Sequence, residues 1–386
     1  AQGAGLRAVK TEAPAQAAAA DAPAAQTAAP ADSLSLPCRA AVLIEPASGR
    51  VLYEKNADER VPIASITKLM TLLLTFEAVH GGKLTLDTPV PVSEHAYHMG
   101  GSQIWLEPGE QFTLDEMLRA ICVSSANDAA VAVAELVGGS EPVFVEQMNA
   151  RAAELGMEDT HFVNPTGLPA EGHVTSAYDI ALMSRELILH HPDIRRFTTI
   201  WMDSLRDGAF GLNNTNKLIR YYEGATGLKT GSTDNALYCL SATAEREGME
   251  LIAVILKSPT STQRFESAKV LLNYGFAAYG LAEVEPEEPL TAIPVRLGTA
   301  ASVTVEMEGE EKLLVTKDKI GTMEVQTQLE TELAAPVEKG QQVGTLTVTS
   351  GEEILAQLPL VAGETVERLS YGQIFLRCLR MAFLGG

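Results

Sequence analysis

Ser65-Ile66-Thr67-Lys68 stands directly before an apolar run at residues 69–79, which ends at Gly81-Gly82. The length of the run and the glycine stop predict a buried helix. Because residues three apart lie on one face of a helix, the Ser65 hydroxyl and the Lys68 amine should be neighbours at its N-terminus. A lysine in apolar surroundings has a lowered pKa and can take the proton of a hydroxyl. The tetrad therefore predicts a serine nucleophile with a lysine base, although Ser-x-x-Lys also arises on the order of once by chance in a chain this long.

Two later motifs strengthen this interpretation. Ser125-Ala126-Asn127 follows an apolar helical run at residues 117–123, and Lys229-Thr230-Gly231 precedes a strand-like segment at residues 236–244. Ser-x-Asn is common by chance, whereas Lys-Thr-Gly is uncommon. The three motifs in this order are typical of penicillin-interactive serine enzymes.

The composition excludes several other classes of protein. The chain has 386 residues and a formal net charge of −21, so nucleic acid is not expected as a partner. The four cysteines are far apart and no His-Glu-x-x-His pattern occurs, so we expect no disulfide framework, no metal and no other cofactor. Cys122 and Cys239 lie in apolar runs and should pack as small hydrophobic residues. No stretch of about 20 apolar residues predicts a membrane-spanning helix.

The order of the predicted elements indicates the fold class. A β-hairpin, the helix after Ser65, a group of helices, two strands and a last helix follow one another along the chain. This order favours an α/β (α+β) sandwich, in which a mostly antiparallel sheet is flanked by helices and carries an all-helical insert. Thr113 and Glu116 form a capping-box pattern at the start of one inserted helix. The expected strands are 39–45, 50–55, 236–244 and 249–256, the other expected helices are 113–123, 128–137, 142–155, 176–190 and 262–279, and a loop with a short strand is expected at 100–110.

Changes in composition divide the chain into four predicted parts. Residues 1–36 are rich in Ala and Pro and predict a disordered tether, and residues 37–282 form the predicted catalytic domain. Residues 283–365 begin with a Glu- and Pro-rich boundary and predict a small all-β domain. Its expected strands are 302–307, 312–315, 323–329, 344–348 and 354–360.

The last part, residues 366–386, has helical periodicity. Its polar residues fall on one face, and a wide apolar arc covers the remainder. This pattern predicts a basic amphipathic helix that lies on a membrane surface. The alternative is a terminal helix that packs against the β domain. The polar face consists of Ser370, Gln373, Arg377 and Arg380.

The chain resembles the serine-type D-alanyl-D-alanine carboxypeptidases, which are low-molecular-mass penicillin-binding proteins. The resemblance covers about residues 37–384 and includes, besides the three motifs, the segments 100–103, 162–168 and 335–344. It implies hydrolysis of the bond between the two D-alanines of a peptidoglycan stem pentapeptide through an acyl-serine. It also implies covalent inhibition by β-lactams. We expect an exported protein that acts outside the cytoplasm, on the outer face of the cytoplasmic membrane, after removal of a signal peptide.

The resemblance also implies a role for each motif residue. Ser65 resembles the nucleophile, Lys68 its base, Ser125 a proton relay to the leaving amine, and Asn127 a residue that orients Lys68 and the substrate amide. Substrate binding is implied at the third motif and the residue after it. Lys229 and Thr230 would bind the terminal carboxylate, Gly231 would allow the substrate strand to approach, and the backbone N–H of Ser232 would join that of Ser65 in an oxyanion hole.

Three other functions remain open at this stage. A class A-like β-lactamase would use a Glu to activate the deacylating water, and residues 162–168 contain no carboxylate, although Glu158, Asp159 and Glu171 flank them. A D,D-endopeptidase acting on cross-links would carry the same motifs. The alternative outside enzymes is a penicillin-sensing or wall-binding module, which would not need an intact nucleophile and base.

Overall fold

The computed structural model describes residues 34–309 and 312–384, and most of the predicted tether at residues 1–36 lies outside them. The described residues form two compact units. One contains residues 34–285 and 312–323, and the other contains residues 286–309 and 324–384.

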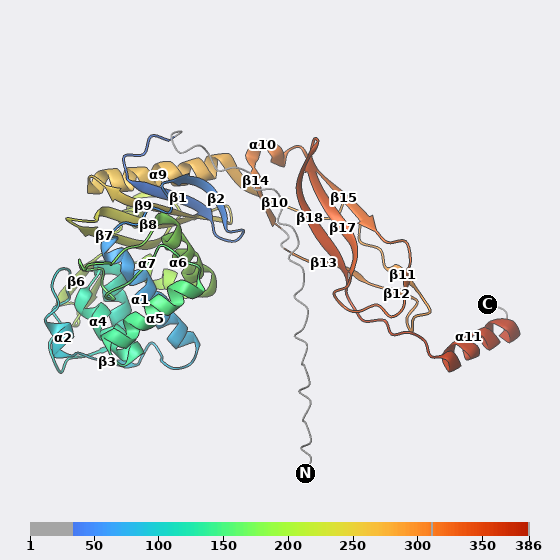
Figure 1. The fold of residues 1–386 in the computed structure, drawn as a ribbon, viewed down its shortest axis with the longest axis horizontal. Coiled ribbons are helices and arrows are strands. Elements are labelled where there is room, and N and C mark those ends of the chain that lie inside the picture. Colours follow the sequence, from blue (N-terminus) through green and yellow to red (C-terminus); the bar gives the residue numbers. More distant parts are fainter. Residues whose placement is uncertain (1–33, 310–311, 385–386) are drawn as a thin grey trace, which may run out of the picture. The chain divides into compact units, whose positions relative to one another are not determined.

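A five-stranded antiparallel sheet forms the centre of the first unit, as expected (Figure 1). The strand order is β2-β1-β9-β8-β7, so β7 lies at one edge. The strands are β1 (Ala40–Glu45), β2 (Arg50–Lys55), β7 (Ala225–Thr233), β8 (Leu237–Arg246) and β9 (Met249–Ser258).

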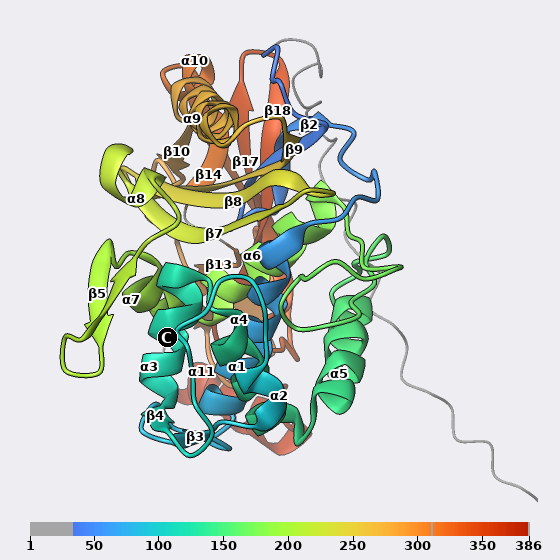
Figure 2. The same ribbon diagram turned by 90° about the vertical axis from the view of Figure 1, so that its left-hand side faces the viewer.

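The sheet is buried on both faces because its strands alternate between two apolar cores. Along β1, Val42 and Ile44 belong to one core, whereas Ala41 and Leu43 belong to the other. This is the period of two that side chains follow along a strand. Helix α9 (Ser261–Ala278) covers the second face, and α1 (Lys68–His80) and α6 (Ala177–His190) lie on the first (Figure 2).

The helical insert begins and ends close to the expected residues. The predicted capping box is present, because Thr113 Oγ1 accepts from the Glu116 N–H and the Glu116 carboxylate accepts from the Thr113 N–H. Ser140 and Ser176 cap two later helices, because each side chain accepts from a backbone N–H group in the first turn. The inserted helices are α3 (Leu114–Arg119), the π-helix η2 (Ala120–Ser124), α4 (Asn127–Gly138), α5 (Glu141–Glu154) and α6.

The short strand expected within residues 100–110 is wrong. That segment is irregular, and the strand lies after it, where β4 (Gln111–Thr113) pairs with β3 (Pro89–Pro91). The reason is visible at Asp128, whose carboxylate accepts from the backbone N–H groups of Ile104 and Leu106 and replaces strand pairing there. The remaining short elements of this unit are η1 (Ala64–Thr67), α2 (Glu94–Tyr97), η3 (Pro192–Ile194), α7 (Arg195–Thr198), β5 (Met202–Leu205), β6 (Phe210–Asn213) and α8 (Leu218–Tyr221).

The second unit is all-β apart from its C-terminal helix. Its strands form a three-stranded sheet of order β12-β11-β16 and a four-stranded sheet of order β13-β18-β17-β15. Valines and other small apolar residues fill the core between them. The strands are β11 (Ile293–Arg296), β12 (Ser302–Val303), β13 (Val305–Met307), β15 (Met323–Leu329), β16 (Leu333–Ala334), β17 (Gln342–Ser350) and β18 (Glu353–Ala362).

One predicted strand of the small domain pairs elsewhere. Residues 312–315 were expected among its strands, but β14 (Lys312–Thr316) pairs antiparallel with β10 (Tyr279–Glu283), and α10 (Lys317–Ile320) follows it. The main-chain oxygen of Leu314 also accepts from the Arg50 guanidinium at 3.2 Å. The segment therefore belongs to the first unit. The sequence could not predict this, because an alternating pattern predicts a strand without indicating its partner.

The C-terminal helix α11 (Tyr371–Leu384) begins later than the expected residue 366. Val366 instead pairs with Val337, and the Leu369 N–H donates to Leu297 O, so these residues are held in extended backbone. Ser370 caps the helix by accepting from the Gln373 N–H at 3.4 Å. Within the described residues, no helix is both long and apolar enough to cross a bilayer.

Candidate active site

Ser65 and Lys68 lie together at the start of the buried helix. Ser65 belongs to η1 and is half-buried, and Lys68 is the first residue of α1 and is fully buried. Lys68 Nζ lies 2.9 Å from Ser65 Oγ, 2.6 Å from Asn127 Oδ1 and 2.8 Å from Thr166 O. The Asn127 amide cannot turn over, because its Nδ2 donates to Gly100 O at 2.7 Å.

These contacts favour the neutral amine. Burial, followed by the charge of Lys229, holds the pKa of Lys68 well below its ordinary value, and Asp128 opposes the shift. A neutral amine has two N–H groups and one lone pair. The two carbonyl oxygens, of Asn127 and Thr166, can only accept and so take the two N–H groups. The lone pair is then directed at Ser65 Oγ, which can donate its hydrogen to it.

Ser125 and Lys229 form a second pair in the same site. Ser125 directly follows the π-helix η2, and its backbone is left-handed with a φ of 62°. Lys229 Nζ donates to Ser125 Oγ at 2.8 Å and to Thr230 O at 2.9 Å. Burial lowers the pKa of Lys229 to about 7, and the Arg264 charge acts in the same direction. The amine nevertheless remains a donor to the hydroxyl in either protonation state.

The Lys-Thr-Gly motif lies inside strand β7, and not before a strand as expected. The two glycines at 227 and 231 hide the strand pattern in the sequence. A Cβ on Gly231 would lie 2.6 Å from Ile63 O and 3.0 Å from the backbone nitrogen of Ser65. Glycine is therefore required for β7 to approach the chain's own Ser65 turn, a role that differs from the expected approach of the substrate.

The other predicted binding residues line the same strand. Thr230 is buried, and its Oγ1 donates to Thr215 Oγ1 at 2.7 Å. Ser232 follows at an exposed position near the end of the strand. The structure thus brings together the eight residues that the motifs indicated, from β7, from η1 and the start of α1, and from the segment between η2 and α4.

Asp128 is a residue of the site that the motifs did not indicate. It is fully buried, and its carboxylate accepts from three backbone N–H groups, those of Ile104, Leu106 and Ala129. It thereby holds the loop in which Gly100 O contacts the Asn127 side chain and Ser102 O accepts from the Asn127 N–H. The only signal for it in the sequence is an acidic residue directly after the Ser-x-Asn motif.

The loop at residues 160–175 supplies further contacts that sequence reasoning missed. Gly167 has a φ of 83°, and a Cβ there would lie 1.8 Å from Ala64 O. His173 Nδ1 accepts from the Val163 N–H at 3.0 Å, so its Nε2–H donates to Thr67 Oγ1 at 2.7 Å. Burial lowers the pKa of His173 to about 4, which keeps the ring neutral. Both contacts fasten the loop to the Ser65 turn and so position Thr166 O against Lys68.

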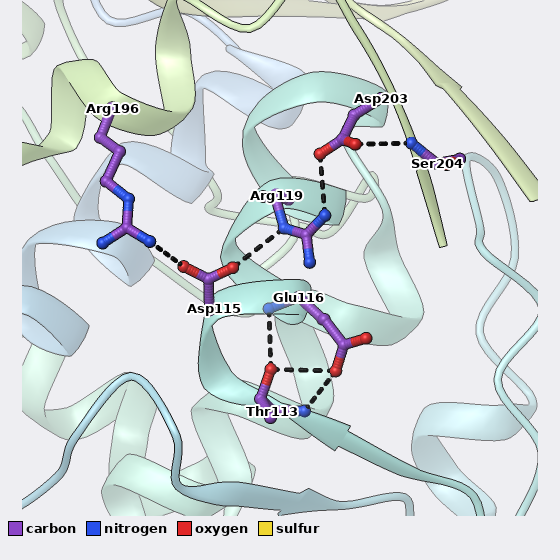
Figure 3. Close-up of polar contacts among 7 residues, drawn as sticks. All are labelled: Thr113, Asp115, Glu116, Arg119, Arg196, Asp203 and Ser204. Carbon is purple, nitrogen blue, oxygen red and sulfur yellow. Dashed lines mark hydrogen bonds and ion pairs between the residues drawn. The ribbon is translucent and has the colours of Figure 1, made fainter. Parts of the chain in front are cut away.

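Charged residues support the Ser125 segment from outside. Arg119 lies at the end of α3, donates to Asp115 at 3.0 Å and reaches Asp203 on β5 at 2.9 Å (Figure 3). Arg196 on α7 donates to the other oxygen of Asp115 at 2.9 Å (Figure 3). The network ties α3, which continues through η2 to Ser125, to two neighbouring elements. No group of His, Cys, Asp and Glu side chains in the described residues could hold a metal ion.

Two family models match this chain. A family model described as D-alanyl-D-alanine carboxypeptidase matches residues 24–260. The chain belongs to this family. A second model, described as penicillin-binding protein 5, C-terminal domain, matches residues 284–368.

Relatives of this family align with most of the chain. D-alanyl-D-alanine carboxypeptidase DacF of Bacillus subtilis is 41% identical over 346 residues, which are 88% of this chain and 88% of the relative. The crystal structures of penicillin binding protein 5 from Haemophilus influenzae have a TM-score of 0.77 at 28% identity and cover 86% of this chain and 98% of that one. A D-alanyl-D-alanine endopeptidase of Pseudomonas aeruginosa is 33% identical, but over 56% of this chain and 70% of its own.

Proposed function

We propose that this serine peptidase is a D,D-carboxypeptidase that removes the terminal D-alanine from peptidoglycan stem pentapeptides. The observation that carries the proposal is the position of Lys68 Nζ, with two carbonyl acceptors on its N–H groups and its lone pair toward Ser65 Oγ. Such an amine takes the serine proton as Ser65 Oγ attacks the carbonyl between the two D-alanines. The acyl-serine that forms is then hydrolysed by water.

The second pair serves the leaving group. Ser125 Oγ accepts from Lys229 Nζ and keeps its own hydrogen free to donate. It passes a proton to the departing D-alanine amine as the C–N bond breaks. The proton that Lys68 took from Ser65 then moves through the hydrogen bonds of the site to Ser125 and replaces the one that Ser125 gave away.

Strand β7, at the edge of the sheet, binds the substrate. Lys229 and Thr230 receive the terminal carboxylate, which needs a cation and a hydroxyl donor, so the Thr230 hydroxyl turns from Thr215 Oγ1 to the substrate on binding. The substrate lies along β7 as an added strand, since β7 is at the edge of the sheet. The backbone N–H groups of Ser65 and Ser232 stabilise the oxyanion. β-Lactams acylate Ser65 in the same position.

Two rival activities are less well supported. A β-lactamase needs a carboxylate that activates water, and Lys68 contacts no carboxylate among its described hydrogen-bond partners. The flanking Asp159 pairs with Arg60 at 2.8 Å. An endopeptidase is favoured by one relative of that name, which aligns with a smaller part of the chain than the carboxypeptidases do.

The location of the protein follows from its substrate. Peptidoglycan is outside the cytoplasm, and α11 holds the protein on the outer face of the cytoplasmic membrane. Large apolar side chains of α11 support this, since Tyr371, Phe375 and Leu376 are 94%, 66% and 62% exposed. The chain then consists of the four parts expected from the sequence, except that residues 312–323 belong to the catalytic unit.

Release of D-alanine from diacetyl-Lys-D-Ala-D-Ala tests the function. We expect release by the full chain and its loss after incubation with penicillin. A penicilloyl-enzyme that persists for minutes is expected of a carboxypeptidase, and turnover within milliseconds would instead indicate a lactamase. Cleavage of cross-linked muropeptides without release of D-alanine from the tripeptide would indicate the endopeptidase.

A further inference from the structure

A cavity of 320 Å³ lies beside the Ser65 turn. Ala64 lines one side, Gly167 and Glu171 line a second side, and Thr233 and Asn235 line a third at the end of β7. The volume lies within the range of about 300–1,000 Å³ that is usual for ligand pockets. None of the residue roles assigned above uses this cavity.

The direction of β7 indicates which part of the substrate reaches the cavity, if the proposed function is correct. The carboxylate end of the substrate is at Thr230, and its scissile carbonyl is at Ser232. The remainder of the stem peptide must continue in the same direction, past Thr233 toward Asn235. Each residue of an extended chain advances by about 3.3 Å, so the residue before D-Ala-D-Ala lies one or two positions beyond Ser232. Its side chain is therefore beside the cavity.

The cavity carries one uncompensated charge. Glu171 is exposed and makes no ion pair with any other described residue. The second titratable residue of the lining, His173, is neutral because its pKa lies at about 4 and its ring is held by Thr67 and Val163. Thr233 and Asn235 are uncharged. The cavity therefore favours a cationic side chain over an anionic or neutral one.

We propose that Glu171 binds the free side-chain amine of the diamino acid that precedes D-Ala-D-Ala. The stem of a diamino acid is long and apolar enough to occupy the cavity, with its ammonium at the carboxylate. Glu171 is thus a specificity-determining residue and takes no part in acyl transfer. Because the pair is partly exposed, its contribution is modest, about three- to fivefold in kcat/KM.

Two substrates that differ only at this amine test the proposal. Nα-acetyl-Lys-D-Ala-D-Ala carries the free side-chain amine, and Nα,Nε-diacetyl-Lys-D-Ala-D-Ala does not. The full chain should use the first with a three- to fivefold higher kcat/KM, and the preference should shrink as salt is added. Glu171→Gln should remove the preference and leave kcat/KM for the diacetyl substrate unchanged. Glu158→Gln is the matched control, since Glu158 is also an exposed carboxylate but is not among the residues that line the cavity.

Several results would overturn this inference while leaving the proposed function intact. These are equal use of the two substrates by the unaltered chain, a preference that survives Glu171→Gln, or a preference that is lost equally in Glu158→Gln. Equal slowing of both substrates in Glu171→Gln would place the carboxylate in acyl transfer and also overturn it. Release of D-alanine from neither substrate would instead overturn the proposed function, and this inference with it.

Discussion

At the scale of single residues, Lys68 determines what Ser65 can do. Its contacts with the Asn127 and Thr166 oxygens take its two N–H groups and leave the lone pair for the serine, and burial favours the neutral amine. Lys68→Arg should therefore lose acylation by penicillin by at least about a hundredfold, because a guanidinium stays protonated and cannot act as a base. The rate of acylation, measured with a fluorescent penicillin from pH 5 to 9, checks this. The unaltered chain should lose activity as the pH falls and Lys68 gains a proton, and near-normal acylation in the arginine variant would contradict the role.

Ser65 is the residue that we expect to be acylated. Ser65→Ala removes the only hydroxyl that faces the Lys68 amine among its described hydrogen-bond partners, so D-alanine release and covalent penicillin labelling should both be abolished. Peptide mass spectrometry of the labelled protein gives the position directly. The fold should be unchanged, because Ser65 is half-buried and the substitution removes one oxygen. A label on another residue would refute the assignment.

His173 makes the stability of the site depend on pH. Its pKa in the folded chain is about 4, below the ordinary 6.5, so the proton binds preferentially to the unfolded chain. The stabilisation is fully present above pH 6.5 and is lost as the pH falls toward 4. Between pH 7 and pH 5 the free energy of unfolding should fall by about 2 kcal/mol through this residue. Urea unfolding of the full chain and of His173→Asn measures it.

Comparing the unaltered chain with His173→Asn separates the effect of His173 on stability from the effects of other groups that titrate in acid. Those groups titrate in both chains and cancel in the difference. The advantage of the unaltered chain over His173→Asn should therefore narrow between pH 7 and pH 5. A difference that is constant with pH would show that His173 does not titrate in this range.

Residues in short motifs could be predicted from the sequence, but their supports could not. Ser65, Lys68 and Asn127 are recognisable because their types and spacing are unusual together. Asp128 and His173 act through backbone N–H groups and a hydroxyl that are brought near only by the fold. A single sequence contains no pattern that links residues 128 and 104, or 173 and 67.

At the scale of elements, α3 owes its position to ion pairs at its two ends. The Arg119 side chain is 23% exposed and joins Asp115 and Asp203, so its pairs are partly desolvated. Arg119→Gln should lower the free energy of unfolding by about 1–2 kcal/mol, because it leaves Asp203 without its cation. Arg196→Gln is the control: that side chain is 63% exposed and its pair with Asp115 should contribute less than about 0.5 kcal/mol.

Chemical denaturation and kcat measure the two effects of these substitutions. A larger loss of stability for Arg196→Gln than for Arg119→Gln would contradict the argument from exposure. We also expect Arg119→Gln to lower kcat more than Arg196→Gln, since α3 continues through η2 to Ser125.

Elements with strong periodicity were predicted well, and those without it were not. Helices α4, α5 and α6 have apolar stripes, serines cap α5 and α6, and each of the three begins within one residue of its expected position. Strand β7 was missed because its glycines weaken the pattern, although the close approach to the Ser65 turn requires Gly231. The prediction that residues 312–315 join the sheet of the small domain was wrong, because strand pairing is a property of the folded chain and not of the segment.

At the scale of the whole molecule, the C-terminal helix is the part that we propose binds a membrane surface. Deleting the residues after Ser370 should abolish co-sedimentation with anionic vesicles, because burial of apolar surface contributes about 25 cal/mol per Å². Replacing Arg377 and Arg380 by Gln should weaken binding partially, by roughly 1 kcal/mol for each charge. The cut must come after Ser370 because Val366 and Leu369 pair with the β domain.

Activity on a soluble peptide is the control for this deletion. It should be unchanged, since the eight residues of the proposed site lie before residue 233. Equal sedimentation of the full and shortened chains would favour the alternative in which α11 packs against the β domain.

The pairing of β14 with β10 has a consequence for how this protein can be divided and recombined. Because residues 312–323 belong with residues 34–285, the small unit is two separate stretches of the gene and not one cassette. A fragment that stops near residue 283 would leave β10 with an unsatisfied edge of backbone N–H and C=O groups, which is prone to aggregate. Exchange of the small unit between relatives therefore needs three junctions, near residues 285, 310 and 323, where a contiguous domain would need one.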